Sequence, residues 1–388
     1  MNDSRPRARE IGIDIGIFMP GPWNAITDVQ GVKVGHVTLI EGEGRLVPGK
    51  GPVRTGVTVI LPHDGNLFQE KVPAASYVFN GFGKSIGLHQ ANELGNLETP
   101  IALTNTLCAP LVADALIEWS LRSNPGIGIS TGTVNPVVGE VNDGILNDIQ
   151  GRHVRKEHVF EAIAKAAPGL VEEGSVGAGT GSSCMGWKGG IGTSSRPLPS
   201  NLGGYNIGVL VQTNFGGILT INGAPVGREL GRYAFRRDLH YDTLRYDTPE
   251  MKGSESLDGS VMVVVATDAP LDQRQLQRLA KRVSLGLART GFFGSNGSGD
   301  FFIAFSTAAR IPHSGPPTLR NEVVSNDSMS ALFLAAVEAT EEAVINSILR
   351  ATTVVGRDMR TCDAIDIQQL LEVLRKHDAL NRNKTIVP

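Results

Sequence analysis

The sequence predicts an α/β fold, and three observations carry that prediction. Residues 261–267 and 301–307 are apolar, β-branched or aromatic runs of the kind that form buried strands. Residues 272–290 between them repeat leucine and valine at helical spacing, which indicates an amphipathic helix. The chain of 388 residues is long enough for a sizeable core, and such lengths accommodate two or three domains or one large α/β unit.

The predicted strand, helix and strand indicate where polar residues at the starts of the two strands lie. If the two strands are parallel, the helix carries the chain back and both strands start at the same edge of the sheet. Ser260 precedes the first strand, and Ser298 and Asp300 lie at the start of the second. We therefore expect these three side chains to lie close together, whereas an antiparallel pair would separate them.

The other elements are expected from the same periodicities. Predicted strands cover residues 32–39, 53–61 and 205–213. Predicted helices cover residues 112–121, a stretch from 153 to Pro168, residues 328–349 with a cap at 326–328, and residues 367–375. Residues 228–258 are polar with few core residues, so they are expected to form a flexible boundary.

Composition excludes several classes of protein. With a net charge of -3, 19% charged and 41% hydrophobic residues, the chain is an ordinary globular protein and not a nucleic-acid binder. Three scattered cysteines do not make a disulfide framework or a structural zinc site, so reduced thiols are expected. Residues 1–10 are polar with no apolar run after them, and no stretch reaches membrane-spanning length. A cytoplasmic location without membrane contact is expected.

Three cofactor or metal motifs fail on inspection. Residues 80–85 end in Gly-Lys-Ser, but Val78 stands where a phosphate-binding loop needs its first glycine. The glycine-rich segment of residues 177–196 contains Gly-x-Gly-x-Gly but lacks the βαβ context of a dinucleotide site, so a hairpin or substrate loop fits better. His153 and His158 do not have the helical spacing of zinc ligands. No cofactor and no metal are expected.

The pair Gly259-Ser260 stands where a polar approach meets a buried strand. One interpretation is a turn-type start to that strand. The other is that Ser260 is a nucleophile and that Gly259 is small because the backbone there is closely approached or strained.

Two more polar residues allow a structural and a chemical interpretation. Glu140 lies between a Pro/Gly-flanked turn and an Asp-Gly turn, where a solvated loop acid is the ordinary expectation. Asn214 ends the predicted strand of residues 205–213, where it either caps the strand or donates hydrogen bonds to a developing oxyanion.

These motifs resemble the DmpA family, the L-aminopeptidase D-amidase/esterases and β-peptidyl aminopeptidases. The resemblance lies in Asp-Gly-Ser at 258–260 before Ala-Thr-Asp-Ala-Pro-Leu, in Asn-Ala-Ile-Thr-Asp-Val at 24–29 and in Val-Arg-Thr-Gly-Val-Thr at 53–58. It covers most of residues 20–375. It implies a four-layer αββα sandwich of the N-terminal-nucleophile-hydrolase type, shared with ornithine acetyltransferases.

The resemblance also implies a set of roles. The chain would cut itself between Gly259 and Ser260, giving fragments 1–259 and 260–388 that together form one composite α/β domain. Ser260 would become both N-terminus and nucleophile. Ser298 and Asp300 would assist it, Asn214 would donate to the oxyanion, and Glu140 would receive the substrate's free amino group. Some relatives carry a tyrosine where this chain has Asn142, and glutamate where it has Asp300.

The implied function is a self-processing serine aminopeptidase or amidase that acts on short peptides, amides or esters without a metal. By resemblance, the processed units assemble into a homo-oligomer, a tetramer. An N-acetyltransferase of the ornithine type is an alternative, although its nucleophile is threonine. A second alternative is an unprocessed binding or scaffold protein.

Overall fold

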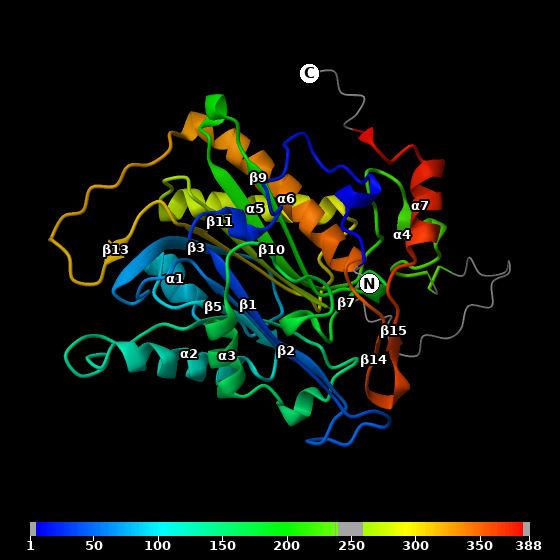
Figure 1. Ribbon diagram of the computed structural model, residues 1–388, viewed down its shortest axis with the longest axis horizontal. Coiled ribbons are helices and arrows are strands. Elements are labelled where there is room, and N and C mark those ends of the chain that lie inside the picture. Colours follow the sequence, from blue (N-terminus) through cyan, green and yellow to red (C-terminus); the bar gives the residue numbers. More distant parts are fainter. Residues whose placement is uncertain (1–4, 237, 240–258, 383–388) are drawn as a thin grey trace.

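The computed structural model describes residues 5–236, 238–239 and 259–382, and they form four layers (Figure 1). Two β-sheets pack face to face, and a pair of helices covers the outer face of each sheet, so the order is αββα. The helices on one side are α5 (Gln273–Arg289) and α6 (Met329–Leu349), and those on the other are α2 (Ala109–Ser123) and α3 (Lys156–Lys165). This is the predicted four-layer architecture.

The larger sheet carries the candidate site and has the order β13-β3-β12-β11-β10-β9, with β4 paired to β3. Its strands are β3 (Glu70–Gly81), β4 (Asn96–Leu97), β9 (Ile191–Pro197), β10 (Asn206–Asn214), β11 (Ser260–Thr267), β12 (Gly299–Ser306) and β13 (Ile311–Pro312). The smaller sheet has the order β1-β2-β5-β6. Its strands are β1 (Lys33–Glu41), β2 (Val53–Leu61), β5 (Ile101–Asn105) and β6 (Val137–Val141).

Shorter elements lie at the edges of these layers. They are α1 (Leu88–Leu94), α4 (Val226–Glu229), α7 (Ile367–Lys376), and two small hairpins, β7 (Ser183–Cys184) with β8 (Trp187–Lys188) and β14 (Val354–Val355) with β15 (Thr361–Cys362). The glycine-rich segment of residues 177–196 therefore contains a hairpin, one of the two structures expected for it.

The period of two along β11 explains why that strand is apolar throughout. Val261, Val263 and Val265 join the core beneath α5 and α6. The alternate residues, Met262, Val264 and Ala266, join the core between the two sheets. A strand buried on both faces has no solvent-facing position, so it reads as a continuous apolar run.

Strands β11 and β12 are parallel, as predicted, with Ser260 opposite Gly299. Helix α5 returns the chain between them, and Asp272 caps it by accepting from the Gln275 N–H at 2.7 Å. Both strands therefore begin at one edge of the sheet. On its other side β11 pairs antiparallel with β10, which brings Asn214 opposite Ser260.

Several local expectations were wrong. Strand β3 was not indicated, although it is the second partner of β12. Helix α3 begins at Lys156 and ends at Lys165, before Pro168. Ser328 makes no capping hydrogen bond to α6, because residues 326–328 form a turn of 3-10 helix instead.

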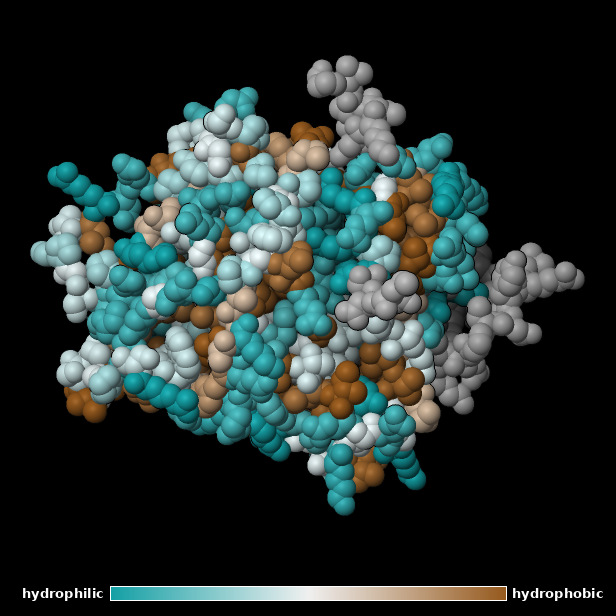
Figure 2. Space-filling model, viewed as in Figure 1, coloured by the Kyte–Doolittle hydropathy of each residue, from teal (hydrophilic) through white to brown (hydrophobic). Residues whose placement is uncertain are grey.

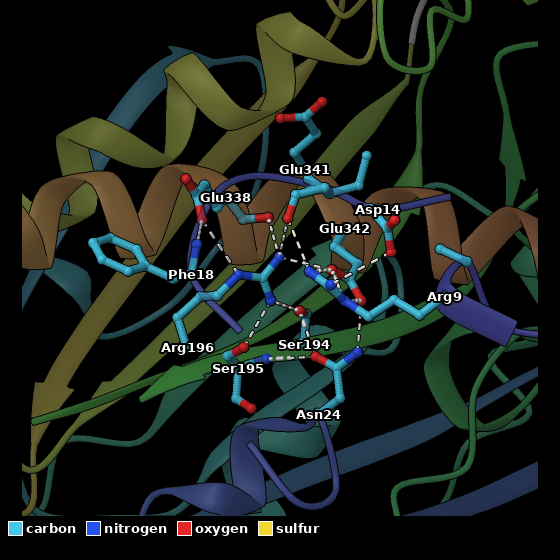
Figure 3. Close-up of polar contacts among 12 residues, drawn as sticks. Arg9, Asp14, Phe18, Asn24, Ser194, Ser195, Arg196, Glu338, Glu341 and Glu342 are labelled. Atoms are coloured by element: carbon cyan, nitrogen blue, oxygen red, sulfur yellow. Dashed lines mark hydrogen bonds and ion pairs between the residues drawn. The ribbon is translucent and has the colours of Figure 1, made fainter. Parts of the chain in front are cut away.

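A buried ionic cluster fastens the N-terminal segment to α6 (Figure 3). The fully buried Arg196 of β9 contacts Glu342 at 2.7 Å, and Arg9 contacts the same carboxylate at 2.9 Å. Glu338 accepts the backbone N–H groups of Ile17 and Phe18 at 2.9 and 3.1 Å. Removing Glu342 would take the nearest carboxylate from the fully buried Arg196, and breaking a buried pair in this way costs about 3–5 kcal/mol. The cluster therefore helps to hold α6 against the sheet that carries Ser260.

The surface is largely hydrophilic on the face drawn in Figure 2, with apolar residues in small separate groups. Within the described ranges, no helix is both long and apolar enough to cross a membrane. Of the flexible boundary expected at 228–258, residues 240–258 are not among the residues that the structure describes.

Candidate active site

The bond between Gly259 and Ser260 lies at the edge where β10, β11 and β12 meet. Ser260 is the first residue of β11 and only 5% exposed, with Asn214 opposite it on one side and Gly299 on the other. The parallel pairing and the shared strand edge are confirmed, and Ser298 and Asp300 flank Gly299, the residue opposite Ser260. The structure thus brings four of the predicted residues to one edge of the sheet.

The hydroxyl of Ser260 lies against the carbonyl that precedes it. Its Oγ donates to the Gly259 carbonyl oxygen at 2.6 Å. The Gly299 N–H donates to the same oxygen at 3.1 Å and lies 3.4 Å from the Ser260 Oγ. A backbone donor at a carbonyl oxygen is positioned to stabilise negative charge that develops there during attack on the carbonyl carbon.

Gly259 itself is required by close approach. A Cβ at this position would lie 2.2 Å from the Asn214 carbonyl oxygen and 2.5 Å from the Phe215 Cα. The sequence interpretation offered close approach or backbone strain, and close approach accounts for the glycine.

Ser298 and Asp300 form a hydrogen-bonded pair beside the junction. The Ser298 Oγ donates to Asp300 Oδ1 at 2.6 Å, and both side chains are buried. Burial raises the pKa of Asp300 to about 6, against the opposing effect of the Ser298 hydrogen bond. In the described part of the chain, Asp300 Oδ2 has no partner and no hydrogen bond joins Ser298 directly to Ser260. The pair is linked to the junction through the intervening Gly299 backbone.

The Asn214 amide is held in one orientation. Its oxygen accepts from the Ser183 N–H at 3.0 Å, and its nitrogen donates to the Asn142 carbonyl at 2.9 Å. An amide nitrogen carries two hydrogens, so one N–H remains, with no partner among the residues that the structure describes. Asn214 lines the pocket in front of Ser260, which makes that N–H a candidate donor to bound substrate.

Glu140 is a buried strand residue and not a solvated loop acid. It lies on β6 and is 2% exposed. Its Oε1 accepts from the Lys84 N–H at 2.6 Å, and its Oε2 accepts from the Thr106 hydroxyl. A carboxylate has about four acceptor positions, so capacity for a substrate ammonium remains. Gly139 lets β6 approach β11, because a Cβ there would lie 2.4 Å from the Met262 Cε.

A pocket of about 500 Å³ connects Glu140, Asn214 and Ser260. This volume is within the range of small-ligand sites, about 300–1,000 Å³. Its wall contains Phe82, Lys84, Thr106, Glu140, Asn142, Gly144, Ile145, Ile149, Ser183, Met185, Gly186, Asn214, Phe215, Gly216, Gly259, Ser260, Gly297 and Arg357. Ser298 and Asp300 are not part of this wall and lie behind it.

Sequence reasoning missed the backbone groups and one cation at this site. The Gly299 N–H was hidden in the Ser-Gly-Asp motif, where only the side chains drew attention. The Ser183 N–H and the Asn142 carbonyl act through main-chain atoms, which residue type does not reveal. Arg357 lies 97 positions after Ser260 in an unremarkable stretch, and no local signal connects it with the pocket.

Comparison with known proteins gives a consistent result. The sequence model of Peptidase family S58 matches residues 24–362. The chain is 43% identical to the beta-peptidyl aminopeptidase BapA of Sphingosinicella microcystinivorans over 97% of this chain and 93% of that protein.

Two solved structures are also similar. A Pyrococcus horikoshii protein superposes with a TM-score of 0.87 and 49% identity, covering 96% of this chain and 99% of the other. The L-aminopeptidase D-Ala-esterase/amidase of Ochrobactrum anthropi is described as a variant of the Ntn hydrolase fold. It superposes with a TM-score of 0.85 and 40% identity, covering 97% of this chain and 100% of the other.

Proposed function

The chain belongs to peptidase family S58, the DmpA family, and on that premise we propose that it is a self-processing serine aminopeptidase or amidase with Ser260 as its nucleophile. Membership makes it a hydrolase with the Ntn hydrolase fold. The observation that carries the proposal is the junction itself, where the Ser260 Oγ and the Gly299 N–H both lie at the Gly259 carbonyl oxygen.

Self-processing follows from this arrangement. The Ser260 oxygen attacks the Gly259 carbonyl carbon, and the C–N bond breaks as the acyl group moves from nitrogen to oxygen. The Ser260 proton ends on the nitrogen, which becomes a free amine. Water then hydrolyses the ester, releasing the Gly259 carboxylate and restoring the hydroxyl. The products are fragments 1–259 and 260–388, which stay together as one α/β unit.

Turnover reuses the same groups on an external substrate. The new α-amino group has an ordinary pKa of about 8, so near neutral pH it accepts the Ser260 proton, with Ser298 as the neighbouring hydroxyl. The free N–H of Asn214 stabilises the tetrahedral oxyanion. Glu140 holds the substrate ammonium, and Asp300 orients Ser298. The Ser260 oxygen attacks the substrate carbonyl carbon, the scissile C–N or C–O bond breaks, and the amine or alcohol leaves with the proton taken from Ser260. Water then hydrolyses the acyl-enzyme, releases the amino acid and restores the hydroxyl.

The substrates proposed are short peptides, amino-acyl amides or esters with a free N-terminus. The names of the relatives mention β-peptides, L-amino acids and D-alanyl esters, so the stereochemistry is a matter for experiment. Membership in a peptidase family favours this function over an ornithine-type acetyltransferase or a scaffold. We also propose that processed units form a homo-oligomer, to be measured by light scattering.

The test is a comparison of the wild type with Ser260→Ala. Denaturing gels and intact mass are expected to give two fragments of 259 and 129 residues for the wild type. The variant is expected to remain a single chain and to hydrolyse none of the L-, D- or β-amino-acyl amides. A wild-type protein that stays intact and hydrolyses no member of the panel would refute the proposal.

A further inference from the structure

The proposed function gives a role to the negative charge in the pocket wall but none to the positive charges there. Glu140 is the carboxylate in the pocket wall, and it is committed to the substrate's ammonium. Two cationic residues, Lys84 and Arg357, also belong to the wall. The Lys84 Nζ lies 4.8 Å from the centre of the Phe82 ring, in a cation–π contact. Arg357 has no role in the steps described above.

The position of Arg357 is fixed by its backbone. It lies in the loop between β14 and β15, and its N–H donates to the Leu146 carbonyl at 2.8 Å. The preceding Gly356 packs so closely that a Cβ there would lie 2.3 Å from the same carbonyl oxygen. The next residue, Asp358, adopts a left-handed conformation with φ of 57° and donates its N–H to the Gly44 carbonyl at 2.7 Å. Non-glycine residues in that conformation persist where surrounding contacts hold them.

The guanidinium still has donors to give. Its Nε donates to the Gly144 carbonyl at 2.6 Å, and its Nη1 lies 3.3 Å from Asp358 Oδ2. Arginine carries five N–H donors, so three remain without a partner among the residues that the structure describes. The side chain is 22% exposed and that of Asp358 is 35% exposed, so their ion pair is partly solvated and weak. A planar fork with free donors on both terminal nitrogens matches a carboxylate.

We propose that Arg357 binds a carboxylate of the substrate, so that the pocket selects zwitterionic or acidic short peptides. The inference rests on the proposed function, since it takes Glu140 as the ammonium site and Ser260 as the point of attack. The carboxylate can come from the C-terminus of a dipeptide, on the leaving side, or from an acidic side chain of the first residue. Both present the same chemistry to the guanidinium.

The test compares substrates in pairs that differ by one carboxylate. One pair is a free dipeptide and the same dipeptide as its C-terminal amide. The other is an aspartyl and an asparaginyl amide. For each pair, the ratio of kcat/KM is measured in the wild type and in the variants Arg357→Gln, Arg357→Lys, Lys84→Gln and Arg360→Gln. Arg360 lies in the same loop and does not belong to the pocket wall, so it is a matched control.

Arg357→Gln also removes the hydrogen bond to the Gly144 carbonyl. Gly144 is two residues after Asn142, whose carbonyl holds the Asn214 amide, so the substitution can lower activity on every substrate. The ratio within a pair is therefore the informative quantity. A general loss of activity cancels within a pair. In at least one pair, the wild type is expected to favour the carboxylate member. Arg357→Gln should lower that ratio about 10-fold or more, mainly through KM, as expected for a lost charge-assisted bond. Arg357→Lys should retain part of it, and Arg360→Gln all of it.

The outcomes separate this inference from the proposed function. The pair that responds identifies the source of the carboxylate. If the wild type hydrolyses amino-acyl amides and Arg357→Gln has the same kcat/KM ratios as the wild type, the inference is overturned and the proposed function stands. If the ratios fall only in Lys84→Gln, the carboxylate binds Lys84 and the assignment to Arg357 is wrong. A wild type without any hydrolysis refutes the function itself.

Discussion

The substitution Gly259→Ala is expected to slow self-cleavage without preventing the chain from folding. The added Cβ would lie 2.2 Å from the Asn214 carbonyl oxygen and 2.5 Å from the Phe215 Cα. Ordinary contact between such atoms is about 3.5 Å or more, so the junction and β10 must separate by about 1 Å. That shift displaces the Gly259 carbonyl from its present position, where the Gly299 N–H donates to it at 3.1 Å.

Overpacking of this kind costs about 1–3 kcal/mol. If the cost falls on the transition state of processing, the rate drops about 5- to 150-fold, at 1.36 kcal/mol for each factor of ten. The assay is the fraction of uncut chain on denaturing gels over time after synthesis, together with the melting midpoint. Gly132→Ala is the control, since a Cβ there meets no atom within 4 Å. Wild-type cleavage kinetics in Gly259→Ala would show that close approach at this residue does not matter for processing.

Three further changes probe the groups around Ser260. Asn214→Ala should lower kcat of the processed enzyme by about 10²- to 10³-fold with little change in KM, because it removes the oxyanion donor; an unchanged kcat would exclude that role. Glu140→Gln should lower kcat/KM for substrates with a free amino group by about 10-fold or more, since a charged partner is lost; equal kinetics with the wild type would contradict an ammonium site. Asp300→Asn should flatten the dependence of stability on pH. The folded pKa of Asp300 is raised from 3.8 to about 6, so its contribution to stability is fully present below about pH 4 and is lost as pH rises through 6. Melting midpoints of both proteins between pH 4 and 8 measure this, and parallel curves would refute it.

The arrangement of Ser260, Ser298 and Asp300 was predictable because it depends on one local unit. A strand, a returning helix and a parallel strand place two strand starts at the same edge, whatever surrounds them. Asn214 was harder, since its antiparallel pairing with β11 spans a stretch that includes residues 240–258. Its position was indicated by resemblance and not by pattern.

Glu140 shows where local interpretation fails. Its Pro/Gly and Asp-Gly neighbours are typical of a loop, yet it lies on a buried strand, because Gly139 lets that strand pack against Met262. Packing against the second sheet outweighed the turn chemistry of the flanking residues. Strand β3 was overlooked for a related reason, since a strand's propensity reflects its neighbours in the sheet as much as its own residues.

By itself, the sequence determined the α/β class, the strands around the junction and the chemical types of the side chains, because these depend on periodicity and on neighbours along the chain. The tertiary structure alone decided which distant groups share the pocket. The Asn142 carbonyl meets Asn214 across 72 residues, and Arg357 meets Gly144 across 213. Such contacts follow from how two sheets and a hairpin pack, and main-chain donors such as the Gly299 N–H have the same identity in every residue except proline. Only the folded chain gives them a place at the scissile carbonyl.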